Sequence, residues 1–90
     1  MKIEFDPDKR KAALDDRGQD FAHAWQVFEG PFFTQPDDRY DYPEPRFQTY
    51  GLMSGRLVMF AWTPIDGGIR VISMRKCNDR ERKTYNSRMG

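Results

Sequence analysis

The sequence predicts an α+β fold, in which a small antiparallel β-sheet packs against two N-terminal helices and is followed by a C-terminal helix. Three apolar runs between Arg46 and Arg75 are separated by short turns that contain glycine, which is typical of an antiparallel meander. A helical period of apolar residues precedes the meander, and a helix-capping pattern follows it. The 90 residues suit one domain, which we expect to span residues 1–90.

Residues 2–18 predict a short strand and a first helix. Lys2–Phe5 alternates polar and apolar side chains, so we expect a strand at one edge of the sheet. Asp6 and Pro7 fit the N-cap and the first position of a helix. That helix is expected to run to about Arg17 and to end at Gly18.

A second helix is predicted from its N-cap, Asp20, to the Gly30–Pro31 pair. Its apolar residues recur at the spacing of one helix face, which we expect to pack on the sheet. They are Phe21, Ala24, Trp25 and Phe28. Residues 32–34 then predict a short strand, and the stretch 35–45, rich in proline and acidic residues, predicts an exposed loop.

The central run of the meander is apolar on both faces. Its side chains form two alternating sets, Leu57, Met59 and Ala61 on one face and Val58, Phe60 and Trp62 on the other. We therefore expect a central strand that is covered on both sides or that meets a partner on one side.

The last helix is predicted to begin at Asn78. Glu81 lies three residues further on, so the two residues match a capping box. The rest of the segment is polar except for Tyr85 and Met89, which share one face. We expect this helix to have little packing energy of its own.

Composition narrows the functional classes. The net charge is +1, so the field of the whole protein argues neither for nor against nucleic acid, although acidic residues dominate 1–45 and basic residues dominate 46–90. Cys77 is the single cysteine and His23 the single histidine, so no zinc-site spacing exists. We expect no metal and no cofactor, a surface position for His23 and a partly buried one for Cys77. No secretory leader or membrane-spanning run is visible, so we expect a cytoplasmic protein with no membrane partner.

Arginines give the strongest functional signal. Four of them lie at or near the ends of strands that are otherwise built to be buried: Arg46, Arg56, Arg70 and Arg75. Guanidinium groups bind phosphate through paired hydrogen bonds, so this set predicts an anion site. Ion pairs with the acidic half of the chain are the simpler alternative. Because Arg70 and Arg75 are five positions apart, a regular strand directs them to opposite faces. They can converge only if a bulge intervenes or if Arg75 already lies past the end of the strand.

The order of motifs resembles a known family. The motifs are FDPDK (5–9), G-x-x-F-x-x-A-x-x-x-F (18–28), R-x-x-x-x-G (46–51), G-R (55–56), I-R-V-I-S-M-R (69–75) and E-R-x-x-Y (81–85). Together they resemble the BrnT toxins, the toxin half of BrnT/BrnA type II toxin–antitoxin pairs, over nearly the whole chain.

The resemblance implies a RelE-like fold and a ribonuclease that blocks translation. It also implies a BrnA-like ribbon-helix-helix antitoxin as the partner in a hetero-oligomer, with operator DNA contacted only through the antitoxin. The family commonly has a Lys-His-Gly triplet at the end of the first helix, where this chain has Asp16, Arg17 and Gly18. If that histidine is the general base, this chain is expected to be weakly active or inactive.

From the resemblance and the arginine pattern we expect metal-independent cleavage, in which a ribose 2′-hydroxyl attacks its own phosphodiester. Guanidinium groups aimed at the charge that develops in the transition state stabilise it. The expected catalytic residues are Lys9, Arg46, Arg70, Arg75 and Glu81. The expected RNA-binding residues are Arg17, Arg56 and Tyr85. Arg17 is expected to hold a flanking phosphate together with Lys9, and Tyr85 is expected to stack on a base.

Two other functions remain open at this stage. A catalytically silent homologue would bind the antitoxin and tune its DNA binding, which the Asp16–Arg17 departure favours. A plain nucleic-acid binder would show a steep salt dependence and no cleavage products. The low net charge makes this last function the least favoured of the three.

Overall fold

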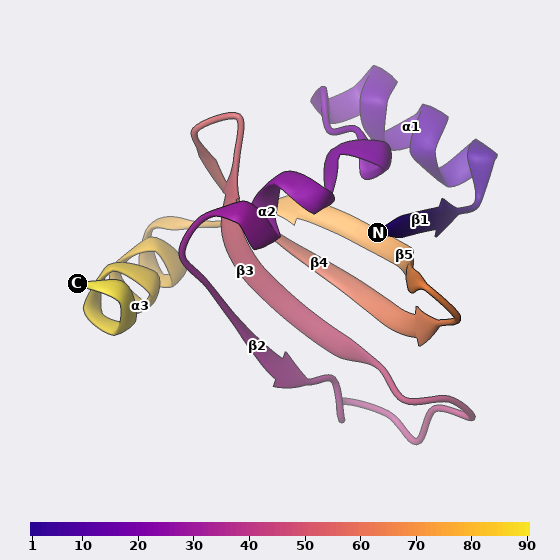
Figure 1. Ribbon diagram of the computed structural model, residues 1–90. Coiled ribbons are helices and arrows are strands. Elements are labelled where there is room, and N and C mark those ends of the chain that lie inside the picture. The colour runs from indigo at the N-terminus through magenta and orange to yellow at the C-terminus, as the bar shows by residue number, and fades with distance from the viewer.

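The computed structural model describes residues 1–90 and shows a five-stranded sheet in the order β1-β5-β4-β3-β2. The strands are β1 (Lys2–Phe5), β2 (Phe32–Pro36), β3 (Phe47–Met53), β4 (Arg56–Ile65) and β5 (Gly68–Lys76). Strands β2 to β5 pair antiparallel, whereas β1 pairs parallel with β5 at the sheet edge (Figure 1). The predicted α+β class, meander and N-terminal edge strand are therefore confirmed.

The two hairpins of the meander have the turns that their sequences predict. Ser54 and Gly55 join β3 to β4 with φ of 51° and 80°. Positive φ at both turn residues matches the right-handed twist of the paired strands. Gly67, with φ of 77°, takes the left-handed position in the turn between β4 and β5.

Helix α1 (Pro7–Arg17) begins and ends as predicted. The Asp6 side chain accepts a hydrogen bond from the Asp8 N–H, and Gly18 closes the helix in the left-handed conformation with φ of 66°. Helix α3 (Asp79–Met89) also begins as predicted, with a complete capping box between Asn78 and Glu81. No helix combines the length and the apolar character that a membrane crossing requires.

The prediction of one continuous second helix was wrong. The segment forms a 3-10 turn, η1 (Phe21–His23), and then a separate short helix, α2 (Trp25–Glu29). The break at Ala24 turns the following residues, so that Val27 is fully buried while Trp25 is 41% exposed. A single helical period could not describe both halves.

Apolar clusters cover both faces of β4, as its two-sided pattern predicts. The larger cluster joins Val58 and Phe60 to the N-terminal helices, and the smaller joins Leu57 and Met59 to Tyr85 of α3. Figure 1 shows α2 crossing over the sheet and α3 at one end of it. At Gly51 of β3 a Cβ atom would lie 2.5 Å from Val27 Cγ1, so glycine lets α2 approach the sheet.

The acidic loop is shorter and less exposed than predicted. Strand β2 extends through Pro36, and Asp37, expected to be solvated, has a side chain with 0% exposure. Two basic side chains, Arg39 and Arg46, surround its carboxylate and so allow it to be buried.

Candidate nucleic-acid interface

Half of β5 has no strand beside it on the side away from β4. Strand β1 pairs only with residues 68–71, so residues 72–76 form a free edge. The side chain of Gln19 covers part of this edge. In the amide orientation that its neighbours require, Gln19 donates to the Met74 carbonyl oxygen at 3.1 Å and accepts from the Lys76 N–H at 2.9 Å. Gln19 is only 3% exposed, so it replaces strand pairing at a point where water is excluded.

A hollow of about 400 Å³ lies along this free edge, and we call it the edge hollow. Residues of α1, η1, β4 and β5 line it, together with one residue of the loop after β2. Four of the lining residues are basic and none is acidic. The basic residues are Lys9, Arg17, Arg39 and Arg75. An anion is therefore the natural occupant of the edge hollow.

Arg75 is oriented by Glu81. Two guanidinium nitrogens donate to the two carboxylate oxygens, Nη1 to Oε1 at 2.7 Å and Nη2 to Oε2 at 2.8 Å. These bonds hold the pKa of Glu81 below its usual range and raise that of Arg75. Because Glu81 also caps α3, the same carboxylate joins the start of α3 to β5. The pair fixes the direction of the Arg75 side chain.

Arg39 is fixed by the buried Asp37 in a similar way. Its Nε and Nη2 atoms each donate to a carboxylate oxygen at 2.8 Å. The hydrogen bonds from Arg39 lower the pKa of Asp37. The Arg39 side chain keeps 53% exposure, so the guanidinium reaches the edge hollow while it stays anchored. Arg39 was not among the predicted site residues, because nothing in the local sequence pattern separates it from a solvated loop residue.

Arg46 and Arg70 lie outside the edge hollow. The Arg46 guanidinium packs on the Tyr42 ring at 3.8 Å, its Nε lies 3.8 Å from Asp37 Oδ2, and its side chain is only 15% exposed. Arg70 lies 3.8 Å from Glu4 on β1. These positions give both arginines a local acidic partner, which was the simpler alternative.

A bulge does bring Arg70 and Arg75 to one face of the sheet. The pairing shifts at Ala61 and Trp62, so Arg75 stands opposite Met59 and Arg70 opposite Thr63. Met59 and Thr63 share a face because they are an even number of residues apart. Four residues of strand separate the Cα atoms of the two arginines by about 13 Å, and Arg75 lines the edge hollow whereas Arg70 does not.

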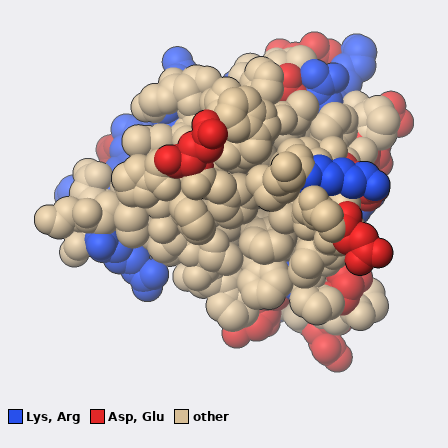
Figure 2. Space-filling model, in the orientation of Figure 1, with Lys and Arg blue, Asp and Glu red and all other residues tan.

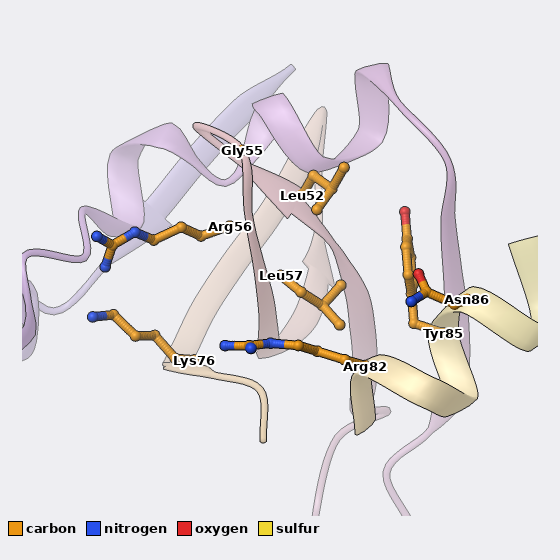
Figure 3. A pocket seen from close by; sticks show the side chains of 8 residues that line it. All are labelled: Leu52, Gly55, Arg56, Leu57, Lys76, Arg82, Tyr85 and Asn86. Atoms are coloured by element: carbon orange, nitrogen blue, oxygen red, sulfur yellow. The ribbon is translucent and has the colours of Figure 1, made fainter. Parts of the chain in front are cut away.

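Arg56 and Tyr85 line a second hollow of about 500 Å³ at the start of α3, together with Lys76 and Arg82 (Figure 3). Tyr85 is only 6% exposed, and its hydroxyl donates to the Pro31 carbonyl oxygen at 2.6 Å. Its ring therefore anchors α3 to the sheet and leaves little surface for stacking on a base.

The remaining chemically versatile residues occupy separate places. His23 is exposed at the surface, with Nε2 3.9 Å from Asp20 Oδ2, and Cys77 is buried, as expected. Burial raises the pKa of the Cys77 thiol to about 11, which makes it a poor nucleophile. No three residues among His, Cys, Asp and Glu are grouped to hold a metal ion.

Residues 5–81 match the sequence model of a family described as "Ribonuclease toxin, BrnT, of type II toxin-antitoxin system". The chain belongs to the BrnT family. A BrnT toxin is a ribonuclease toxin, and a type II system implies a cognate antitoxin. No curated protein matches the chain. For this BrnT chain, the edge hollow is the candidate site at which RNA is bound.

Proposed function

We propose that this BrnT toxin cleaves RNA in the edge hollow without a metal ion, by attack of a ribose 2′-hydroxyl on the adjacent phosphodiester. The observation that carries the proposal is the gathering of Lys9, Arg17, Arg39 and Arg75 around one hollow without an acidic lining residue. The phosphate gains negative charge in the transition state of this reaction. Fixed cations that face it stabilise that state more than the ground state.

The basic residues of the edge hollow have different roles, according to whether an acidic partner fixes their side chains. Arg75 is oriented by Glu81 and Arg39 by Asp37, so both offer fixed donors to the reacting phosphate. Lys9 and Arg17 are exposed and have no acidic partner within 4 Å, so they hold flanking phosphates. In the reaction the 2′-hydroxyl gives its proton to water as its oxygen bonds to phosphorus, and the 5′-oxygen leaves and takes a proton from water. The products are a 2′,3′-cyclic phosphate and a 5′-hydroxyl.

Arg46, Arg70, Arg56 and Tyr85 take supporting roles in this proposal. Arg46 holds the Asp37 region, and Tyr85 anchors α3. Arg70 and Arg56 lie away from the cleaved bond, since neither lines the edge hollow.

We also propose that the antitoxin is a BrnA-like ribbon-helix-helix protein that forms a hetero-oligomer with the toxin in the cytoplasm. Operator DNA is then contacted only through the antitoxin, and translation is blocked when the toxin is free. The face that carries α2 supports a protein partner, because Figure 2 shows it largely free of charged side chains. Trp25 of α2 and Phe32 of β2 are 41% and 39% exposed.

Substitution of Arg75 tests the nuclease. Removal of one charge-stabilising donor typically lowers kcat by about 10²–10³. We expect Arg75→Gln to lower the cleavage rate by that factor, and Arg70→Gln, a matched change outside the edge hollow, to lower it far less. The rate is measured on a fluorescent RNA oligonucleotide, with circular dichroism to check folding. An equal loss in both variants would move the reaction away from the edge hollow.

A catalytically silent antitoxin-binding module is the second candidate. Two observations favour it: Arg17 stands where the family commonly has histidine, and both terminal nitrogens of Arg75 are already bound by Glu81. Induced expression without the antitoxin separates the candidates. Growth arrest with RNA decay supports the nuclease, and normal growth with retained antitoxin binding supports the module.

A further inference from the structure

Two more hollows continue from the edge hollow and share residues with it. A middle hollow of about 310 Å³ contains Arg17, which also lines the edge hollow. The second hollow at the start of α3 shares Arg56 and Lys76 with the middle one. The three hollows therefore adjoin one another along a path from α1, past the end of β5, to α3. We call this path the basic track.

The charge along the basic track is one-sided. Seven of the 15 Lys and Arg residues of the chain line it: Lys9, Arg17, Arg39, Arg56, Arg75, Lys76 and Arg82. The only acidic lining residue is Asp20, and Arg10 binds both of its carboxylate oxygens at 2.8 and 3.0 Å. Three of the seven are paired with acids outside the lining, Arg39 with Asp37, Arg75 with Glu81 and Arg82 with Asp79. The other four have no acidic partner within 4 Å and supply the free positive charge of the path.

The far part of the track is shaped for more than a single anion. In Figure 3, Arg56 and Lys76 direct their charged ends to the same side, and Arg82 reaches toward that side from α3. Arg56 and Lys76 are exposed and have no acidic partner within 4 Å. Leu52 and Leu57 provide apolar surface in the same hollow. A line of cations beside apolar surface is typical of grooves that bind a single nucleic-acid strand, because phosphates and base faces are bound together.

We propose that the basic track binds one single strand of RNA, whose scissile phosphate lies in the edge hollow and whose flanking nucleotides cross Arg17 and reach Arg56, Lys76 and Arg82. The inference rests on the proposed function of the edge hollow and adds a second binding region to it. The longest dimension of the molecule is 32 Å, so the track accommodates at most about nine stacked nucleotides at 3.4 Å each. The substrate is therefore a single-stranded RNA segment several nucleotides long.

The test uses strands that cannot be cleaved. Fluorescent oligodeoxyuridylates of 12 and 4 nucleotides lack the 2′-hydroxyl, so their binding is independent of catalysis. Their affinities are measured by fluorescence anisotropy at 50 and 200 mM salt for three proteins. These are the wild type, the Arg56→Gln/Lys76→Gln variant, and the matched Lys11→Gln/Lys83→Gln variant. Lys11 and Lys83 are exposed and line none of the three hollows, and the second variant changes the net charge equally.

The expected result follows from counterion release. Each phosphate contact on a single strand contributes about 0.7 to the slope of log affinity against log salt, so loss of two contacts lowers the slope for the 12-mer by about 1.4. Between 50 and 200 mM salt the wild type then loses about sevenfold more affinity for the 12-mer than the Arg56→Gln/Lys76→Gln variant does. The Lys11→Gln/Lys83→Gln variant keeps the wild-type slope, and the 4-mer shows a much smaller difference.

Three outcomes would overturn the track. The first is an unchanged salt slope in the Arg56→Gln/Lys76→Gln variant. The second is an equal change of slope in the Lys11→Gln/Lys83→Gln variant. The third is that oligoglutamate of equal charge displaces the labelled 12-mer as effectively as the unlabelled 12-mer does. The last outcome would assign the surface to an acidic protein segment. The nuclease is judged separately: a wild type that binds the 12-mer as expected but leaves the corresponding RNA uncut supports the track and refutes cleavage.

Discussion

The buried carboxylate of Asp37 permits a sharp prediction about both stability and site geometry. Substitution by asparagine removes the charge that two guanidiniums share, with hydrogen bonds of 2.8 Å to Arg39 and an approach of 3.8 Å to Arg46. Hydrogen bonds to charged groups contribute about 1.5–3 kcal/mol each, and the half-exposed Arg39 places its bonds at the low end. Asparagine keeps one acceptor oxygen, so one of the two charged bonds is lost, and we expect Asp37→Asn to lower the free energy of unfolding by about 2 kcal/mol.

Thermal unfolding by circular dichroism measures this loss. For a domain of this size 1 kcal/mol shifts Tm by about 4–8 °C, so the expected decrease is about 8–16 °C at pH 7. Asp38→Asn is the matched control, because Asp38 is exposed and has no basic partner within 4 Å. A decrease of less than 2 °C in Asp37→Asn, or an equal decrease in both variants, would refute the ion-pair account.

The pH dependence gives an independent check. The pKa of Asp37 is lowered in the folded protein, mainly by its hydrogen bonds with Arg39. A lowered folded pKa contributes stability above the unfolded value of about 3.9, and this contribution is lost as pH falls through the folded pKa. The decrease in Tm between pH 7 and pH 3 should therefore be larger for the wild type than for Asp37→Asn. Equal acid sensitivity in the two proteins would mean that Asp37 makes no such contribution.

Two more predictions concern residues near the free edge of β5. Gln19→Leu should lower the free energy of unfolding by about 2 kcal/mol, because a buried donor and a buried acceptor of the strand lose their partner. Urea unfolding at pH 7 measures this loss, and an unchanged free energy of unfolding would contradict the two hydrogen bonds. Cys77 should react with a maleimide at pH 7.5 much more slowly in the folded protein than in the urea-unfolded protein, because burial raises the pKa of its thiol to about 11. Equal reaction rates in the two states would contradict that burial.

Much of the fold could be predicted because its signals are local. The capping residues of α1 and α3 and the glycine turns of the meander act within a few positions, and each begins or ends its element where predicted. The second helix was mispredicted because its shape depends on the sheet beneath it. The break at Ala24 lets α2 turn Val27 onto Gly51 of β3, and no window of sequence contains both partners.

The site could be predicted only in part, for a related reason. Lys9, Arg17 and Arg75 were singled out and do line one hollow, whereas Arg39 was missed and Arg46 and Arg70 lie elsewhere. Which arginine is free and which is paired depends on acids that approach from other elements. Asp37 lies in the loop that precedes β3 and Glu4 on β1, and nothing in the strand sequences indicates either contact.

In the proposed nuclease, the division between anchored and free cations accounts for cleavage without a histidine in the edge hollow. Glu81 and Asp37 cancel charge but fix the direction of Arg75 and Arg39, and donors that are already oriented need no reorganisation when the phosphate gains charge. Lys9 and Arg17 have no such partner, so they supply the net positive potential that attracts the strand. The fixed donor geometry thus comes from Arg75 and Arg39, and the attraction of the RNA strand comes from Lys9 and Arg17. In that proposal Arg17, at the position where the resemblance implies a histidine, binds a phosphate instead of transferring a proton, and catalysis depends on charge stabilisation.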